Sequence, residues 1–364
     1  MMISKENLMY ALTIGGALAG KNKVVPIFEY VKCEVKGKDF IVTSNDSECE
    51  AKYRVPYEES EGDFAFCVIA KDFISTVKSI KDDNVSLVID GDNLLIKHSK
   101  GVAQLPTTDA NVFPVSVRDG VAEQLFIQSE KLIEWIKTSQ NFIGKDDLRP
   151  IMQGMFMRVK PSLLEVCATD AHKMFCDELT LVDDFAPFEA VIPARCFGAL
   201  LNILNTCEKV EVLNYEKNIE FLTDFGAIVC RKIEGNFPNF RAVIPQTNPN
   251  DGCFNVSKAD FIESVSRAGM FTEVSTARLK LEVTDGKLHI NGTNIDFCKY
   301  ADEYLNVGSN SNFEISLKAD YLLSCLNSII DDNVIAWVIS PDRPIIFEDR
   351  ARQGKIILQM PMVG

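Results

Sequence analysis

Three stretches of ten residues begin alike, and they decide the fold: ISKENLMYAL at 3–12, IQSEKLIEWI at 127–136 and VSKADFIESV at 256–265. Each places a serine near an apolar residue and continues in a helical pattern, as a capped helix start does. Two apolar positions four residues apart recur in all three: Leu8 and Leu12, Leu132 and Ile136, Phe261 and Val265. Residues with this spacing share one face of a helix, so each stretch predicts a helix with a buried stripe.

A second helix is predicted inside each repeat, in segments 68–80, 191–204 and 315–329. Phe73, Phe197 and Tyr321 occupy one register in these segments, and a β-rich segment follows each of them. The repeat of about 120 residues is longer than the 20–50 residues of a solenoid repeat, so each copy is predicted to be a whole domain. The predicted domains are 1–120, 121–248 and 249–364.

Short alternating strands surround these helices, as in 279–290, where Asp285-Gly286 predicts a hairpin turn. About eight strands and two helices per repeat indicate an α+β fold with antiparallel sheets. The sequence therefore predicts three tandem copies of one two-helix, antiparallel-sheet domain.

The amino-acid composition argues against several classes of function. The 364 residues carry a net charge of −14, which taken alone argues against a nucleic-acid partner. No apolar run approaches the roughly 20 residues that span a bilayer. The 11 cysteines include no C-x-x-C pair and fit no common zinc spacing, so we expect buried apolar cysteines in a reducing compartment, the cytoplasm. With only three histidines, we expect no catalytic residues, no metal and no cofactor.

Two features of the N-terminus are misleading. Residues 8–20 resemble the apolar part of a signal peptide, but they belong to the first repeat. Gly15, Gly20 and Lys21 nearly spell a phosphate-binding loop, but Asn22 stands where Ser or Thr is required. The order is also reversed, since a predicted helix precedes the loop and a predicted strand, 24–31, follows it.

Four segments carry a resemblance to the bacterial DNA polymerase III β subunit family, the sliding clamps. Segment 148–159 (LRPIMQGMFMRV) looks like the first strand pair of the family's middle domain, and CATDAHKM at 167–174 is similar to A-T-D-G-H-R-L. EGNFPNFRAVIP at 234–245 follows E-G-x-F-P-x-Y-x-x-V-x-P, and Met360-Pro361-Met362 lies near the family's terminal M-P-M. The segments occur in the right order, and the resemblance covers the whole chain.

The resemblance implies a ring, in which domain 1 of one chain contacts domain 3 of a second chain. Helices would line the hole around duplex DNA, and sheets would form the outer wall. A negative protein can hold DNA if its basic groups face inward, through salt-screened contacts to phosphate without sequence specificity. The residues expected to contact DNA are Lys21, Lys23, Lys71, Lys78, Lys137, Lys145, Arg149 and Arg195.

The resemblance also implies an apolar pocket for a short linear peptide, which would be carried by the replicative polymerase, the clamp loader, repair polymerases, ligase and mismatch-repair proteins. By position in the matched segments, the pocket comprises Met152, Thr169, Ala171, His172, Lys173, Met174, Pro238, Ala242, Val243, Leu358, Met360, Pro361 and Met362. Ala171 stands where the family usually has glycine, and the chain ends in Val363-Gly364 instead of Arg-Leu. Peptide preference is therefore left open.

Three functions compete at this point. The first is a non-enzymatic clamp that keeps a polymerase on DNA. The second is a nucleotide-using transferase built on the Gly15–Lys21 loop, which lacks the required flanks. The third is a scaffold that binds proteins but not DNA, and it would need no inward basic helices.

Overall fold

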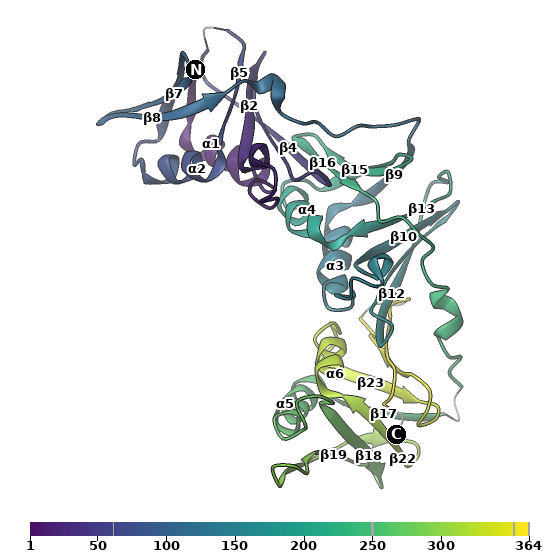
Figure 1. Ribbon diagram of the computed structural model, residues 1–364. Coiled ribbons are helices and arrows are strands. Elements are labelled where there is room, and N and C mark those ends of the chain that lie inside the picture. Colours follow the sequence, from purple (N-terminus) through teal and green to yellow (C-terminus); the bar gives the residue numbers. More distant parts are fainter. Residues whose placement is uncertain (61, 249–250, 352–353, 363–364) are drawn as a thin grey trace. The chain divides into compact units, whose positions relative to one another are not determined.

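The computed structural model describes residues 1–60, 62–248, 251–351 and 354–362, and in this part of the chain it has 25 β-strands and six α-helices (Figure 1). The chain forms two compact units, Met1–Glu134 with Arg195–Lys232, and Trp135–Ala194 with Ile233–Gly364. The middle repeat thus contributes to both units. The sequence boundary proposed at 248/249 and the terminal pair Val363-Gly364 fall at residues outside those described.

The first helix of each repeat forms where the sequence predicts it: α1 (Lys5–Ile14), α3 (Ser129–Ser139) and α5 (Lys258–Gly269). Ser4 caps α1, since its Oγ accepts a hydrogen bond from the Asn7 backbone N at 3.2 Å, and Ser257 caps α5 in the same way. All six residues of the predicted stripes are completely buried. The spacing of four therefore identified the core face of these helices.

The second helices are α2 (Ala70–Ser79), α4 (Phe197–Leu204) and α6 (Ala319–Leu326). Phe73 and Phe197 are buried, but in α6 the buried residue at the equivalent position is Leu322, and Tyr321 is only half-buried. The register assigned to Tyr321 was therefore wrong by one residue. Its ring instead stacks on His172, with ring centroids 5.6 Å apart.

One twelve-stranded sheet runs through the first unit, in the order β1-β6-β7-β8-β5-β2-β3-β4-β16-β15-β14-β9. The strands of the first repeat are β1 (Met2–Ser4), β2 (Tyr30–Lys36), β3 (Asp39–Asn45), β4 (Cys49–Pro56), β5 (Phe64–Ile69), β6 (Asn84–Asp90), β7 (Asn93–His98) and β8 (Gly101–Thr108). Those of the middle repeat are β9 (Glu123–Gln128), β14 (Lys209–Asn214), β15 (Asn218–Thr223) and β16 (Gly226–Arg231). The sheet crosses from one repeat to the next where β4 pairs antiparallel with β16. Helices α1 and α2 lie side by side and pack against this sheet (Figure 1).

The second unit has a nine-stranded sheet and a four-stranded sheet, in the orders β13-β10-β11-β12-β25-β24-β23-β17-β21 and β20-β19-β18-β22. The middle repeat supplies β10 (Gly154–Lys160), β11 (Leu163–Thr169), β12 (Lys173–Thr180) and β13 (Phe188–Pro193). The last repeat supplies β17 (Gly252–Ser257), β18 (Arg278–Thr284), β19 (Lys287–Asn294), β20 (Lys299–Asn306), β21 (Gly308–Ser309), β22 (Phe313–Lys318), β23 (Asn333–Val338), β24 (Ile345–Glu348) and β25 (Ile356–Gln359). Here the repeats join where β12 pairs with β25. Two helices and antiparallel strands in each repeat confirm the α+β prediction.

Three local expectations are settled by the backbone. The predicted strand 24–31 is wrong: Pro26–Glu29 is a 3-10 helix, because proline fixes φ and lacks a donor, and β2 begins only at Tyr30. Segment 148–159 contains one strand, β10, after the short helix Pro150–Met152, rather than a strand pair. The hairpin at Asp285-Gly286 is confirmed, with φ values of 49° and 76°. No helix among the described residues is both long and apolar enough to cross a bilayer.

Candidate functional site

Strand pairing brings two distant segments to one edge of the second unit. Thr169 ends β11 and lies opposite Met174 of β12. On the other side of β12, Met174 lies opposite Leu358 of β25. The backbone N of Met360 then donates to the carbonyl oxygen of His172 at 2.7 Å. The sheet register therefore places the chain's C-terminal segment beside the β11–β12 turn.

The β11–β12 turn itself is held by side chains of its own sequence. Thr169 Oγ1 donates to the Lys173 carbonyl at 2.9 Å and accepts from the Ala171 backbone N at 3.1 Å. Asp170 Oδ1 accepts from the backbone N of His172 and of Lys173, each at 2.9 Å. Its Oδ2 pairs with Lys173 Nζ at 2.8 Å, a buried cation that also lies 5.4 Å from the Tyr321 ring. This network fixes the turn between two strands.

A third segment, which follows β16, lies beside the β11–β12 turn and the C-terminal segment. Phe237 stacks on Phe156 with ring centroids 4.6 Å apart, and Phe240 meets Phe156 edge-on at 6.0 Å. These contacts hold the short helix Phe240–Val243 against the sheet. The aromatic residues of the segment thus attach it to the sheet, and Pro238 and Val243 lie beside the turn.

The three segments enclose an apolar cavity of about 180 Å³. Of the thirteen residues predicted for the pocket, ten line it: Met152, Thr169, Ala171, His172, Lys173, Met174, Pro238, Val243, Leu358 and Met360. Ala242, Pro361 and Met362 are not in its lining, and the Met362 backbone N donates to the Ser316 carbonyl at 2.8 Å. Asn239 and Phe240 also line the cavity and were missed. Asn239 stands at a variable position of the matched segment, whereas Phe240 stands at its fixed aromatic position and was not assigned to the pocket.

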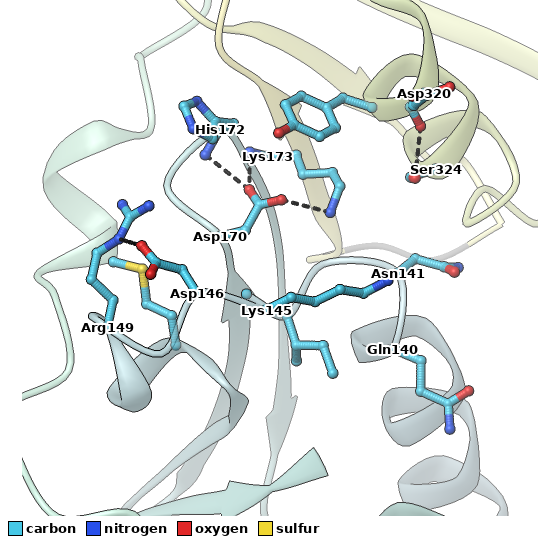
Figure 2. Close-up of a pocket in the computed structure, with 14 residues that line it drawn as sticks. Gln140, Asn141, Lys145, Asp146, Arg149, Asp170, His172, Lys173, Asp320 and Ser324 are labelled. Carbon is cyan, nitrogen blue, oxygen red and sulfur yellow. Dashed lines mark hydrogen bonds and ion pairs between the residues drawn. The ribbon is translucent and has the colours of Figure 1, made fainter. Parts of the chain in front are cut away.

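A second, more polar cavity of about 470 Å³ adjoins the first and shares Met152, His172 and Lys173 with it. Figure 2 shows its side chains: the Asp170–Lys173 pair lies between the helix that carries Asp320 and the loop that carries Lys145. The apolar cavity thus continues past His172 into a polar space.

An ion-pair network connects the short helix Phe240–Val243 of the pocket to the sheet. Glu165, whose side chain is 2% exposed, accepts from Arg158 at 2.7 Å and from Lys160 at 2.8 Å. It also accepts a hydrogen bond at 3.0 Å from Arg241 Nε, which belongs to the pocket's short helix. Burial opposes ionisation of Glu165, but the hydrogen bonds from Lys160, Arg158 and Arg241 outweigh it and lower its pKa to about 2. One carboxylate therefore ties the pocket helix to the sheet.

We expect Glu165→Gln to lower the free energy of unfolding by about 3 kcal/mol at pH 7, because three cations then lose their shared anion. The folded pKa lies below the unfolded value of about 4.5, so the native contribution is complete above pH 4.5 and is lost as pH falls towards 2. Urea unfolding at pH 7, 4.5 and 3 should show the wild-type advantage shrinking. The exposed neighbour Glu189→Gln is the control, with a change below about 0.5 kcal/mol. An equal gap at every pH would contradict this account.

Ala171 has a φ of 75°, in the left-handed region. A non-glycine residue there costs about 1 kcal/mol, so we expect Ala171→Gly to raise the free energy of unfolding by up to about that amount. Ala242→Gly, outside that region, should lower it by about 0.5–1 kcal/mol. Paired thermal melts measure both, and a destabilised Ala171→Gly protein would contradict the strain.

The eight predicted DNA contacts differ in their surroundings. Lys71 and Lys78 on α2, and Lys137 on α3, are exposed and form no ion pair within the described part of the chain. Lys21, Lys23 and Lys145 are exposed in loops. Arg149 pairs with Asp146 at 3.1 Å, and Arg195 pairs with the buried Asp46 at 3.0 Å. Among the described residues, the two arginines thus already form ion pairs, unlike the three helix lysines.

Three tandem copies of a two-helix, antiparallel-sheet domain define the class of three-domain clamps. The models for the N-terminal, central and C-terminal domains of the DNA polymerase III beta subunit match residues 1–117, 126–239 and 241–363. The chain belongs to the DNA polymerase III beta subunit family. It is a sliding clamp of DNA replication and a non-catalytic subunit.

Known sliding clamps align with this chain over almost its whole length. The beta sliding clamp of Vibrio cholerae is 24% identical over 99% of this chain and 98% of its own, and that of Escherichia coli K12 is 23% identical over the same shares. Among solved structures, a DnaN sliding clamp from Pseudomonas aeruginosa bound to griselimycin has a TM-score of 0.94 at 22% identity, covering 100% of this chain and 99% of its own. The beta subunit from Thermotoga maritima has a TM-score of 0.91 at 20% identity, with the same coverage. These structures share the fold.

Proposed function

We propose that two copies of this chain join head to tail into a ring around duplex DNA, and that the ring tethers the replicative polymerase through the apolar cavity. The observation that carries the proposal is the exposed lysines on repeated helices of an otherwise acidic chain. A closed ring encircles the duplex, so it needs no tight contact with DNA. Tethering to the ring then raises the polymerase's local concentration at the primer end. Two-fold symmetry closes the assembly.

The lysines lie opposite the buried faces of their helices. In α2, Phe73 and Val77 are buried whereas Lys71 and Lys78 are exposed. Lys137 follows the buried Ile136 in α3 and is itself exposed. Such side chains suit salt-screened contacts to phosphate, which permit sliding. The net charge of −14 would discourage DNA from binding elsewhere on the surface.

The experiment is the combined variant Lys71→Ala, Lys78→Ala and Lys137→Ala. If all three contact phosphate, the slope of log K against log salt should fall by about 2 to 3. Fluorescence anisotropy with a labelled duplex, read from 25 to roughly 200 mM salt, measures it. The control removes three exposed lysines from hairpin turns and strand ends, Lys38, Lys217 and Lys287. Equal slopes for wild type and the helix variant would reject the DNA-facing role.

The apolar cavity fits the Leu and Phe side chains of a short linear peptide. Three methionines, Met152, Met174 and Met360, line it, and flexible thioethers adapt to different partners. We propose that the replicative polymerase subunit, the clamp loader, repair polymerases, ligase and mismatch-repair proteins compete for this site. All would act in the cytoplasm.

Two unpaired strand edges suit the ring contact. In the first unit, β8 pairs with β7 along its length but with β5 only at Thr107 and Thr108. In the second unit, β20 is an outer strand of the four-stranded sheet. Both carry exposed apolar side chains, Val102 on β8 and Tyr300 and Tyr304 on β20. Pairing β8 of one copy with β20 of the other would cover both edges.

A further inference from the structure

Three cysteine thiols meet inside the first unit. Cys49 begins β4, Cys230 lies in β16, and Cys196 ends the short helix Ala194–Cys196 that leads into α4. Their Sγ atoms all lie within 4.8 Å of one another, and each residue is completely buried. No other set of three metal-ligating side chains comes this close in the part of the chain that the structure describes.

The backbones of these cysteines are held in place. Cys49 and Cys230 lie directly opposite each other in the β4–β16 ladder. The buried carboxylate of Asp46 accepts from the Cys49 backbone N at 2.8 Å and, through its other oxygen, from Arg195 Nη2 at 3.0 Å. Arg195 directly precedes Cys196, so one carboxylate positions two of the three ligands. Hydrogen bonds of this kind orient the ligands of metal sites.

We propose that Cys49, Cys196 and Cys230 form a three-thiolate site for a thiophilic d¹⁰ metal ion such as Zn²⁺. With Zn–S bonds of about 2.3 Å, the sulfur atoms around one ion lie roughly 3.8–4.0 Å apart, which the observed spacing reaches with sub-ångström movement. Three thiolates and one divalent ion leave a single negative charge, and the Arg195 guanidinium lies on the neighbouring carboxylate. Binding forms three metal–sulfur bonds and releases three thiol protons.

Such a site would join two repeats. Cys49 belongs to the first repeat, whereas Cys196 and Cys230 belong to the middle one. A bound ion would therefore fasten the point where the sheet crosses between repeats, next to the β4–β16 pairing. This role is independent of the ring, the DNA contacts and the peptide cavity.

Cadmium is the probe, because cadmium–thiolate bonds absorb in the near ultraviolet. Reduced, chelator-treated full-length protein is titrated with Cd²⁺ in the presence of a weak competing chelator. We expect one tightly bound Cd²⁺ per chain, competition by Zn²⁺, and a higher melting temperature with metal. Cys196→Ala should weaken binding by at least about 100-fold, because one of three bonds is lost.

The matched control is Cys176→Ala. Cys176 and Cys167 are also buried cross-strand partners, but they lack a third thiol, so this variant should bind Cd²⁺ as wild type does. Equal binding by Cys196→Ala would overturn the proposal, as would the absence of tight binding by wild type. If Cys196→Ala fails to fold, X-ray absorption on the wild-type cadmium complex decides, with three sulfur neighbours expected. Fewer than three would assign the metal to other groups and overturn the site.

Discussion

Val243→Asp is expected to weaken binding of a short peptide carrying Leu and Phe by at least about 100-fold, or roughly 2.7 kcal/mol. Val243 lines the apolar cavity, and its side chain is half exposed, so the change should leave the fold intact. Burying one Leu or Phe of the peptide contributes about 1.5–3 kcal/mol, and a carboxylate in the cavity would have to lose its water when the peptide enters. Fluorescence polarisation with a labelled synthetic peptide measures the change.

Val182→Asp is the matched control, because Val182 is a fully exposed valine of the same unit outside the cavity. Its peptide affinity should equal that of wild type. Both variants should keep the wild-type melting temperature and DNA affinity. A Val243→Asp protein that binds the peptide as wild type does would place the docking site elsewhere, without affecting the ring or the DNA contacts.

Local periodicity predicted the helices well. The stripes at Leu8, Leu132 and Phe261 are buried because a spacing of four is a property of the helix itself. The two compact units were not predicted, since they depend on the β4–β16 and β12–β25 pairings between repeats. Pairings between strands far apart in the sequence leave no local pattern to read.

The pocket residues were predicted from their positions in the matched segments. Fixed positions such as Thr169 and Met360 line the cavity, whereas Asn239 stands at a position that the pattern leaves variable. Tyr321 was assigned to the register of Phe73 and Phe197, but the last repeat is shifted by one residue, and the Tyr321 ring lies against His172. That contact became visible only with the β11–β12 turn in place.

The cysteine cluster shows where spacing rules fail. Zinc patterns describe ligands that are close in sequence, as in C-x-x-C pairs. Cys49 and Cys196 are separated by more than one whole repeat, and only the sheet that crosses between the repeats brings the thiols together. The sequence therefore predicted buried apolar cysteines, which is correct for these three but wrong for the exposed Cys298, and it did not predict the clustering.

Val102→Asp and Tyr304→Asp are each expected to convert the ring dimer to monomers, raising the dimer Kd at least about 100-fold. Val102 is 57% exposed on β8 and Tyr304 is 63% exposed on β20, so neither change disturbs a core. In the proposed ring both side chains become buried in the contact, where an unpaired carboxylate is strongly unfavourable. Sedimentation velocity at micromolar concentration measures the change. Val117→Asp, in an exposed loop of the first unit, should remain dimeric.

Mixing the two variants separates a ring from any other dimer. Each contact joins β8 of one copy to β20 of the other, so either variant alone damages both contacts. In a mixed dimer, both changes fall in one contact, and the second contact is wild type on both sides. The mixture should therefore recover dimers that are open at one contact and are not retained on circular DNA, whereas wild-type rings are. Recovery of dimers together with retention would contradict the head-to-tail closure, and a dimeric Val102→Asp protein on its own would remove β8 from the contact.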